Sequence, residues 1–232
     1  MKIEDNIIKG SRVIIAIFLP LVLLMTILQI YTFNLDFYLN TYEKNNVYAT
    51  TGMNRNDLER ATLKLMNYLK DKEDNLDIEA VIHGEKREVF GEREKLHMVD
   101  VKHLFLTGNS LKNTGIVFVV VSLIVILKYA KNPGREFCRS IVGAGVLPIV
   151  FAFVLLILMQ IDFNKYFTHF HEIFFDNDLW QLDPNKEVLI QMVPLEFFIE
   201  ISTKIFSWFF GVHLFLAAGA YGLLKKSIRK TI

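Results

Sequence analysis

The sequence predicts an all-α polytopic membrane protein with four transmembrane helices and a small extracytoplasmic α+β cap. The prediction rests on four long apolar runs and on the uneven distribution of basic residues around them. The runs lie at 13–30, 116–127, 141–159 and 197–224. With their flanks, they can each supply the roughly 17–25 residues that cross about 30 Å of hydrocarbon. Four such runs rarely occur together in a soluble helical bundle, so the membrane interpretation is favoured.

The chain is expected to form a single integral membrane domain over residues 1–232. We predict spans at about 12–34, 112–130, 140–160 and 199–224. Two longer segments join the spans, and these are the cap at 35–111 and a loop at 161–198 that carries a second histidine motif. The apolar core of the first span is too long for a signal peptide, and no small-residue cleavage site follows it.

Basic residues indicate how the spans are oriented. Three precede the first span, four lie between the second and third, and four follow the last: Lys2, Lys9 and Arg12, then Lys128, Lys131, Arg135 and Arg139, then Lys225, Lys226, Arg229 and Lys230. The stretch 160–200 carries only two lysines against eight acids. By the positive-inside rule, both termini and the turn at 131–139 are cytoplasmic, whereas the cap and the loop are extracytoplasmic. The single cysteine, Cys138, is placed in the cytoplasmic turn and is a poor candidate nucleophile for an outward site.

The cap contains patterns typical of a helix and a hairpin. Apolar residues of 56–70 recur at helical spacing, and Asn56 is placed to cap the start of this helix. The segments 78–83 and 87–90 are typical of two short strands joined by a turn at Gly84.

A second helix is predicted over 92–105, leading from the cap to the second span. It places His97 and Asp100 three residues apart, on one helix face. A carboxylate in that position can orient an imidazole and stabilise its charged form. A solvated helix with an incidental pair explains the same residues equally well.

The stretch 170–184 combines a histidine and four carboxylates with several aromatic residues, between two apolar runs. A buried core does not tolerate so many acids, so we interpret the stretch as the lip of an active site at a membrane surface. In a helix, His171 shares an aromatic face with Phe167, Phe174 and Phe175 while His169 looks elsewhere, whereas a strand aligns the two histidines. A histidine merely packed among aromatic rings is the alternative.

The end of this stretch is predicted to be a turn. Pro184 disfavours helix at the residue before it, so 182–184 is expected to end the element. Trp180 is most simply an anchor at the membrane interface.

These outward side chains suit three kinds of function. The first is acyl transfer by histidines that move protons and stabilise an oxyanion. The second is a metal-dependent membrane hydrolase with His97, Asp100 and either His171 or His169 as ligands. The third is a non-enzymatic binding or chaperone module. The sequence contains no H-E-x-x-H, G-x-S-x-G, glycine-rich phosphate loop or cysteine-pair motif. The net charge of +1 gives no reason to expect nucleic acid as a partner.

Two motifs resemble those of the bacterial lipoprotein intramolecular transacylases. The first is His97-x-x-Asp100-Val101, after a long outer segment. The second is Phe170-His171-x-x-Phe174-Phe175-x-Asn177-Asp178-x-Trp180-x-Leu182-Asp183-Pro184, before the last span. Together with the four spans, the likeness extends over most of the chain.

The resemblance implies an acyltransferase of the bacterial cell membrane that uses neither metal nor cofactor. Such enzymes move the sn-2 acyl chain of a diacylglyceryl-cysteine to the α-amino group of the same cysteine, which leaves a lyso-form lipoprotein. The implied partners are diacylated lipoproteins as substrates and membrane lipids.

The resemblance also implies that His97 and His171 are the catalytic pair. We expect His171 to act as the base and His97 as the acid or electrophile, with Asp100 as a candidate orienter. The expected supporting residues are Asp100, His169, Asn177 and Asp178, and the expected substrate-pocket residues are Phe174, Phe175 and Trp180.

Overall fold

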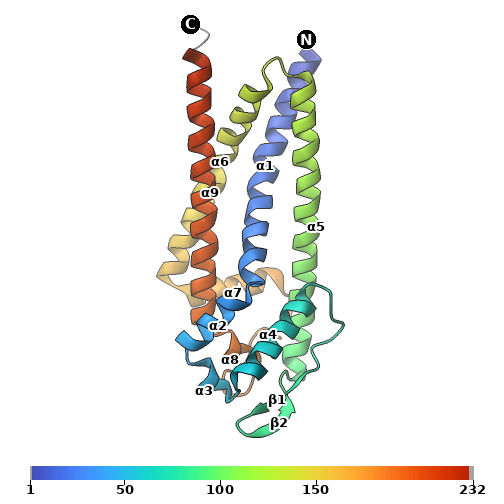
Figure 1. Ribbon diagram of the computed structural model, residues 1–232, viewed down its shortest axis with the longest axis vertical. Coiled ribbons are helices and arrows are strands. Elements are labelled where there is room, and N and C mark those ends of the chain that lie inside the picture. The colour runs from blue at the N-terminus through green and yellow to red at the C-terminus, as the bar shows by residue number, and fades with distance from the viewer. Residues whose placement is uncertain (1, 230–232) are drawn as a thin grey trace. The chain divides into compact units, whose positions relative to one another are not determined.

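The structure is a computed structural model that describes residues 2–229. The helices are α1 (Lys2–Thr32), α2 (Leu35–Lys44), α3 (Val47–Thr51), α4 (Arg55–Leu69), α5 (Glu92–Tyr129), α6 (Pro133–Ile161), α7 (Phe163–Phe174), α8 (Val188–Met192) and α9 (Leu195–Arg229), and the strands are β1 (Glu79–Ile82) and β2 (Glu85–Glu88) (Figure 1). The chain divides into two compact units. Unit 1 contains Met1–Leu28, Asn109–Ile157 and Lys204–Ile232, as far as these are described, and unit 2 contains Gln29–Gly108 and Leu158–Thr203.

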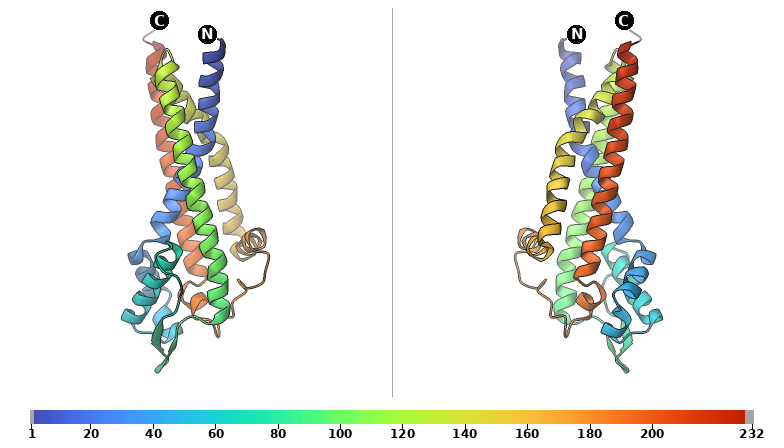
Figure 2. Two further views of the ribbon diagram at one scale, coloured as in Figure 1. Left: turned by 90° about the vertical axis from the view of Figure 1, so that its right-hand side faces the viewer. Right: turned by 90° about the vertical axis from the view of Figure 1, so that its left-hand side faces the viewer.

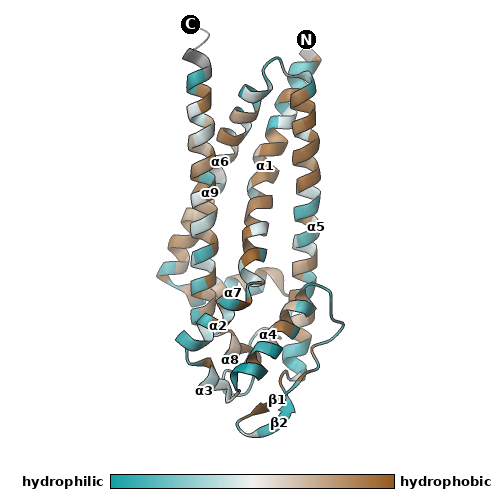
Figure 3. Cartoon of the chain, in the orientation of Figure 1, coloured by the Kyte–Doolittle hydropathy of each residue, from teal (hydrophilic) through white to brown (hydrophobic). Residues whose placement is uncertain are grey.

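Unit 1 is a bundle of membrane-spanning helices. Four helices of the described chain, α1, α5, α6 and α9, are long and apolar enough to cross a membrane, which confirms the predicted fold class. Their parts in unit 1 lie side by side (Figure 2) and are coloured mostly apolar in Figure 3. Their outer faces expose large apolar side chains such as Val117, Leu127 and Phe215. Lipid solvates such a surface and water does not, so the protein is an integral multi-pass membrane protein.

Close contacts between α1 and α5 depend on a glycine. The rings of Phe18 and Phe118 lie with their centroids 4.9 Å apart. Beside them, a Cβ on Gly115 would stand 2.9 Å from Cγ2 of Val22 and 3.3 Å from Cδ1 of Phe18. The small residue therefore lets the two helices approach, as small residues do in membrane bundles generally.

We expect Gly115→Ala to destabilise the bundle, although alanine is the better helix former. The added methyl group meets a short, stiff valine side chain, and overpacking of this kind costs about 1–3 kcal/mol. Gly211→Ala is the matched control, because nothing lies within 4 Å of a Cβ at that position. In thermal unfolding in detergent, Gly115→Ala should melt below the wild type and Gly211→Ala at or above it. Equal melting temperatures for the two variants would contradict the packing argument.

Cys138 lies inside α6, and its predicted place in the turn is wrong. Proline is favoured at the first position of a helix, and Pro133 occupies that position in α6, so the helix begins well before the cysteine. The Cys138 side chain is buried against Ile141 and Ala220. The thiol is therefore part of the packed bundle of unit 1.

Unit 2 has its own core of aromatic and aliphatic side chains. Tyr42 and Leu58 are fully buried, and the Tyr42 hydroxyl is 2.8 Å from the Thr62 hydroxyl, which joins α2 to α4. Phe197, in the first turn of α9, packs its ring 4.7 Å from that of Tyr38. The short helices of the cap are thus held to the start of the last long helix.

The cap of α4 lies two residues before the predicted one. Asn54 caps the helix, because its side-chain oxygen accepts a hydrogen bond from the Asp57 backbone N–H at 3.0 Å. A cap residue must lie just outside the helix to reach a free N–H of the first turn, and Asn56 is already inside it. The prediction of Asn56 as the cap is therefore wrong.

The hairpin follows with the predicted turn. β1 and β2 are antiparallel, with Ile82 opposite Glu85. His83 and Gly84 form the two-residue connection, and both have positive φ angles, of 50° and 86°. Tight turns of this kind match the twist of paired strands. Pairing resumes at once after such a turn, so β2 begins at Glu85 and not at the predicted position 87.

Two helices carry the histidine motifs. α5 runs unbroken from Glu92 to Tyr129, so the helix predicted over 92–105 continues directly into the second span. α7 is a helix, which decides between the helix and strand alternatives for His169 and His171. It ends at Phe174, since Phe175 is extended, and the prediction that 182–184 ends this element is wrong.

Candidate active site

His171 is buried in an aromatic cage near the end of α7. Asp162 caps this helix by accepting a hydrogen bond from the Lys165 backbone N–H at 3.0 Å. The His171 side chain is 7 % exposed. Its ring is stacked on Trp180 at 4.8 Å and 26° and lies 4.4 Å from Phe167 and 5.6 Å from Phe175. Three rings therefore fix the plane of the imidazole.

The surroundings of His171 also select its protonation state. Nδ1 lies 2.7 Å from the Phe167 carbonyl oxygen. Since a carbonyl only accepts, Nδ1 carries the hydrogen and donates it, which leaves the lone pair of the neutral ring on Nε2. Burial lowers the pKa of His171 below its ordinary value, and the bond to Phe167 opposes this only in part. His171 is therefore neutral near pH 7 and can accept a proton at Nε2.

His97 meets His171 from α5. The centroids of the two imidazoles are 6.1 Å apart, and the His97 ring lies edge-on to Phe175 at 5.4 Å. The His97 side chain is 7 % exposed, and its Nδ1 is buried without a hydrogen-bond partner among the described residues. Two buried histidines from different helices thus share one cluster of aromatic rings, Phe167, Phe175 and Trp180, which we call the aromatic pocket, and Phe175 contacts both.

Asn177 connects this pocket to α5. Its side-chain N–H donates to the Asp100 carboxylate at 2.8 Å. Its backbone carbonyl accepts from Nε1 of Trp180 at 3.0 Å. One residue therefore links the carboxylate on α5 to the indole that stacks on His171.

The expected role of Asp100 as a direct orienter of His97 is not what the structure shows. The carboxylate bonds to Asn177, and Nδ1 of His97 has no hydrogen-bond partner in the part of the chain that the structure describes. Residues three apart on a helix share a face, but their side chains need not turn toward each other when a better donor lies elsewhere. Asp100 acts on the loop that holds Trp180.

Arg93 holds the next residue of the same loop. Its guanidinium donates to the Asp178 backbone carbonyl and lies 3.5 Å from the Asp178 carboxylate. Arg93 precedes His97 by one helical turn. The loop 176–182 is therefore tied to α5 by two neighbouring polar contacts, through Asn177 and Asp178.

Glu94 is a buried carboxylate directly beside this site, with 2 % of its surface exposed. One oxygen accepts from the Gly91 backbone N–H and the other from the Leu189 backbone N–H, both at 2.5 Å. Gly91 precedes α5, and Leu189 lies in the first turn of α8. A single side chain therefore caps two helices and ties α8 to the turn of α5 that carries His97.

A model of the lipoprotein intramolecular transacylase family, Lit, matches residues 13–198 of the chain. The match takes in both histidines and both segments that form the pocket. The chain belongs to this family. The intramolecular transacylase function implied by the two motifs is thereby confirmed. No match is found among curated protein sequences.

The fold of this transacylase is similar to solved structures of the membrane integral Lit from Bacillus cereus. One has a TM-score of 0.82 at 22 % identity and covers 97 % of this chain and 99 % of that chain. Two more carry a histidine replaced by Ala or by Arg. Their TM-scores are 0.77 and 0.76, at 21 % and 20 % identity, and they cover 98 % and 99 % of this chain and 98 % and 97 % of theirs.

Two residues predicted for the site of this transacylase lie away from the histidine pair. His169 is half-exposed and pairs with Glu172 at 2.9 Å. Phe174 is 51 % exposed, and its ring packs on Phe170 at 4.8 Å. By contrast, Phe175 and Trp180 both contact His171.

Arg93 and Glu94 were not predicted as part of the site, although the sequence contains spacings that indicate them. Gly91-x-x-Glu94 at the start of a helix is the spacing at which a third-position glutamate reaches back to the cap N–H. Arg93 and His97 are four apart, so they share a helix face. Neither spacing reveals the second partner, which is Leu189 for Glu94 and Asp178 for Arg93.

The predicted metal alternative would need converging ligands. Within residues 2–229, no group of three or more His, Cys, Asp or Glu side chains is placed so that it could hold a metal ion. The predicted set of His97, Asp100 and either His171 or His169 is therefore not such a group.

Proposed function

We propose that this transacylase moves the sn-2 acyl chain of the diacylglyceryl-cysteine of a bacterial lipoprotein to the α-amino group of that cysteine, using His171 and His97. The observation that carries the proposal is the pair of buried imidazoles, 6.1 Å apart between centroids, in one aromatic pocket. The amine and the ester belong to one substrate, so the protein need only stabilise a reactive conformer and handle protons.

The reaction needs one proton acceptor and one proton donor. The α-amino nitrogen forms a bond to the ester carbonyl carbon and gives up a proton, and the bond from that carbon to the glycerol oxygen breaks as this oxygen takes up a proton. The products are an amide and an alcohol, so atoms and charge balance without water or a covalent enzyme intermediate. Well-placed imidazoles supply both proton transfers.

We assign the base to His171. Its Nδ1–H is committed to the Phe167 carbonyl, so Nε2 is the free acceptor for the proton of the amine. His97 then serves as acid or electrophile at the carbonyl or leaving oxygen. Asp100, Asn177 and Asp178 support the pair through the loop that holds Trp180 on His171.

We expect the pH profile of the reaction to show the lowered pKa of His171. The α-amino group of the substrate titrates near pH 8, so the logarithm of the rate should rise with pH with a slope of about one below that value. Below the pKa of His171 the base is protonated as well, so the slope of the logarithm of the rate against pH should change there from about one to about two. We call this change of slope the break. Because burial lowers the pKa of His171, the break should lie below about pH 6.5. Initial rates with a diacylated lipopeptide between about pH 4.5 and 9 locate the break, and a break above 6.5 would argue against His171 as the base.

The pocket walls suit a lipid substrate. Phe175 and Trp180 offer apolar surface beside the two imidazoles, so acyl chains can lie against rings while ester and amine face polar nitrogens. α7 also exposes Phe170, Ile173 and Phe174, and it begins two residues after the third span ends. We propose that this apolar face rests on membrane lipids at the interface.

We propose that the active site is extracytoplasmic. The start of α1, the end of α9 and the turn between α5 and α6 lie at one end of unit 1 (Figure 1). The basic residues Lys128, Lys131, Arg135 and Arg139 flank or lie in that turn. The positive-inside rule assigns this end to the cytoplasm, and the cap and loop that form the pocket then lie on the other side.

Mass spectrometry of a diacylated lipopeptide, before and after incubation with the pure protein, tests the proposal. Intramolecular transfer conserves the mass and moves one acyl chain to the N-terminus in the fragment spectrum. Loss of an acyl group would point to the hydrolase alternative, which also requires stoichiometric metal and chelator-sensitive turnover. An unchanged substrate held in a stable complex would point to the binding module.

A further inference from the structure

We infer that a groove between α1 and α6 binds an anionic phospholipid, with its phosphate group at Lys9, Arg12 and Arg139 and an acyl chain on the apolar floor. All residues of the groove belong to unit 1, whereas the histidine pair belongs to unit 2. The inference therefore does not depend on the assignment of catalytic roles.

The groove is formed by matching faces of the two helices. α1 contributes Lys9, Arg12, Val13 and Ala16, which follow the spacing of one helix face. α6 contributes Arg139, Ser140 and Gly143. The space between them measures about 370 Å³. It is large enough for a head group and the first part of a chain.

The charged end of the groove is cationic and partly pre-organised. Glu136 accepts hydrogen bonds from Nη1 of Arg12 at 3.3 Å and from Nη1 of Arg139 at 2.7 Å. Three cations against this one carboxylate leave a charge of about +2. Each guanidinium has five N–H donors and spends few of them on Glu136, so both keep donors for phosphate oxygens.

The other end of the groove is apolar and open. Val13 is 57 % exposed, and a Cβ on Gly143 would meet nothing within 4 Å. On α1 the cations come before Val13 and Ala16, and on α6 Arg139 comes before Gly143. Because α1 and α6 each begin at the same end of unit 1, both place charge at that end and apolar surface deeper in the bundle (Figures 1 and 3).

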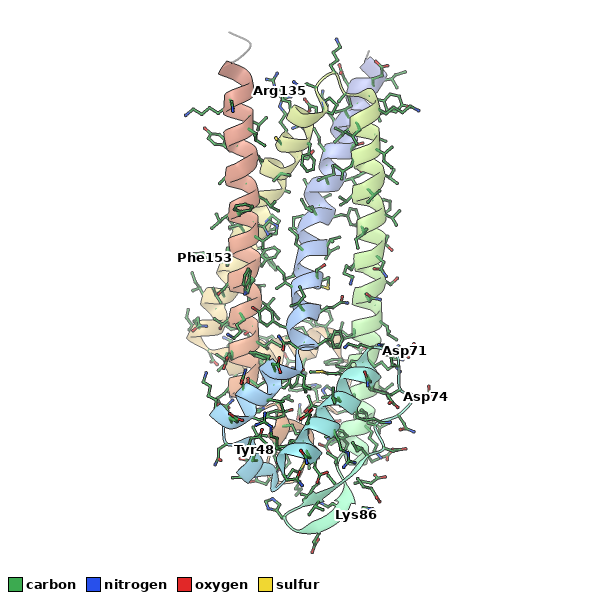
Figure 4. All side chains as sticks on the ribbon, in the orientation of Figure 1. Tyr48, Asp71, Asp74, Lys86, Arg135 and Phe153 are labelled. Carbon is green, nitrogen blue, oxygen red and sulfur yellow. The ribbon has the colours of Figure 1, made fainter. Side chains whose placement is uncertain are left out.

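This distribution favours a lipid over a free phosphate ion. A soluble anion uses the cations but gains nothing from an apolar floor, whereas a phospholipid uses both. Figure 4 shows Arg135 near the same end of the bundle. Basic pockets between membrane helices on the cytoplasmic side match the anionic lipids of that leaflet.

Native mass spectrometry of the full-length protein in detergent tests the site. The probes are phosphatidylglycerol, phosphatidylcholine with the same chains, and glycerol 3-phosphate as the soluble anion. We expect phosphatidylglycerol to bind about tenfold or more tightly than phosphatidylcholine. Lys9→Gln/Arg139→Gln keeps the Arg12–Glu136 ion pair and should weaken phosphatidylglycerol binding by about tenfold or more. Lys131→Gln/Arg135→Gln removes the same charge from this end outside the groove and should change the affinity by less than about twofold.

Gly143→Leu provides a test that leaves the charge unchanged. It fills the apolar floor at a position with open space, so the bundle should fold and bind the lipid less tightly. Equal binding of the two lipids, or equal losses in the two double variants, would overturn the site. Displacement of the lipid by glycerol 3-phosphate at similar concentration would show a free-phosphate site and overturn the lipid assignment. If Gly143→Leu bound the lipid with wild-type affinity, the acyl chain would not lie in the groove.

Discussion

Replacement of His171 by Ala is expected to lower the rate of lyso-lipoprotein formation by about 10²–10⁴-fold, the range typical of a general base. The variant loses the imidazole whose free Nε2 we assign as the acceptor for the proton of the amine. His97→Ala should cause a loss of similar size by removing the second proton-transfer group. The measurement is the initial rate of acyl transfer on a diacylated lipopeptide, with the melting temperature of each variant as a check of folding.

The double variant His97→Ala/His171→Ala sharpens this test. Groups that act as a unit in catalysis are strongly non-additive, so the double variant should lose little more activity than either single one. His103→Ala is the matched control, because His103 is an exposed histidine on the same helix as His97. It should keep its rate within about twofold. A folded His171→Ala protein with nearly wild-type turnover would remove the proposed mechanism.

Replacement of Glu94 by Ala is expected to cause the largest loss of stability, about 2–4 kcal/mol. The substitution leaves the Leu189 N–H buried without an acceptor and removes the side chain that completes the cap of α5. For a chain of this size, such a loss lowers the melting temperature by about 5–15 °C. Turnover should fall as well, since the carboxylate holds α8 beside the turn that carries His97.

Two further substitutions separate the causes. Glu94→Gln keeps one side-chain oxygen as an acceptor, so it should be less destabilised than Glu94→Ala. Glu92→Ala removes an exposed acid from the first turn of the same helix and should cost about 0.3–1 kcal/mol through the helix dipole. If Glu92→Ala and Glu94→Ala melted at the same temperature, the double cap would not be the reason for the loss.

The membrane helices and the short-range elements were predictable because each is encoded locally. A helix in lipid must satisfy its own backbone, so apolar length alone marks α1, α5, α6 and α9. The hairpin could be predicted from two short segments typical of strands on either side of Gly84. The predicted boundaries of α4 and β2 were wrong by about two residues. A helix cap sets the first boundary and a tight turn sets the second, and the residue pattern does not fix the exact position of either.

The site was predictable only in part. His171 could be chosen over His169 once a helix was assumed, since the helix places the aromatic residues at positions 167, 174 and 175 on one face with it. Of these three, Phe174 is exposed. Asp100 was assigned to His97 from helical spacing, but the carboxylate found a donor in Asn177, which comes from a distant loop. Trp180 was predicted as an anchor for the membrane and is also the ring stacked on His171.

The sequence by itself determined the class of protein, the spans and the two motifs that indicate a lipoprotein transacylase, because hydropathy and short motifs are properties of the local chain. Only the tertiary structure decided that His97 and His171 share one pocket, which way Asp100 turns, and that Glu94 caps two helices. Each of these depends on which partner from a remote segment arrives within hydrogen-bond or ring-contact distance. Spacing along one helix limits which residues can share a face, but it does not determine which remote residue each of them contacts.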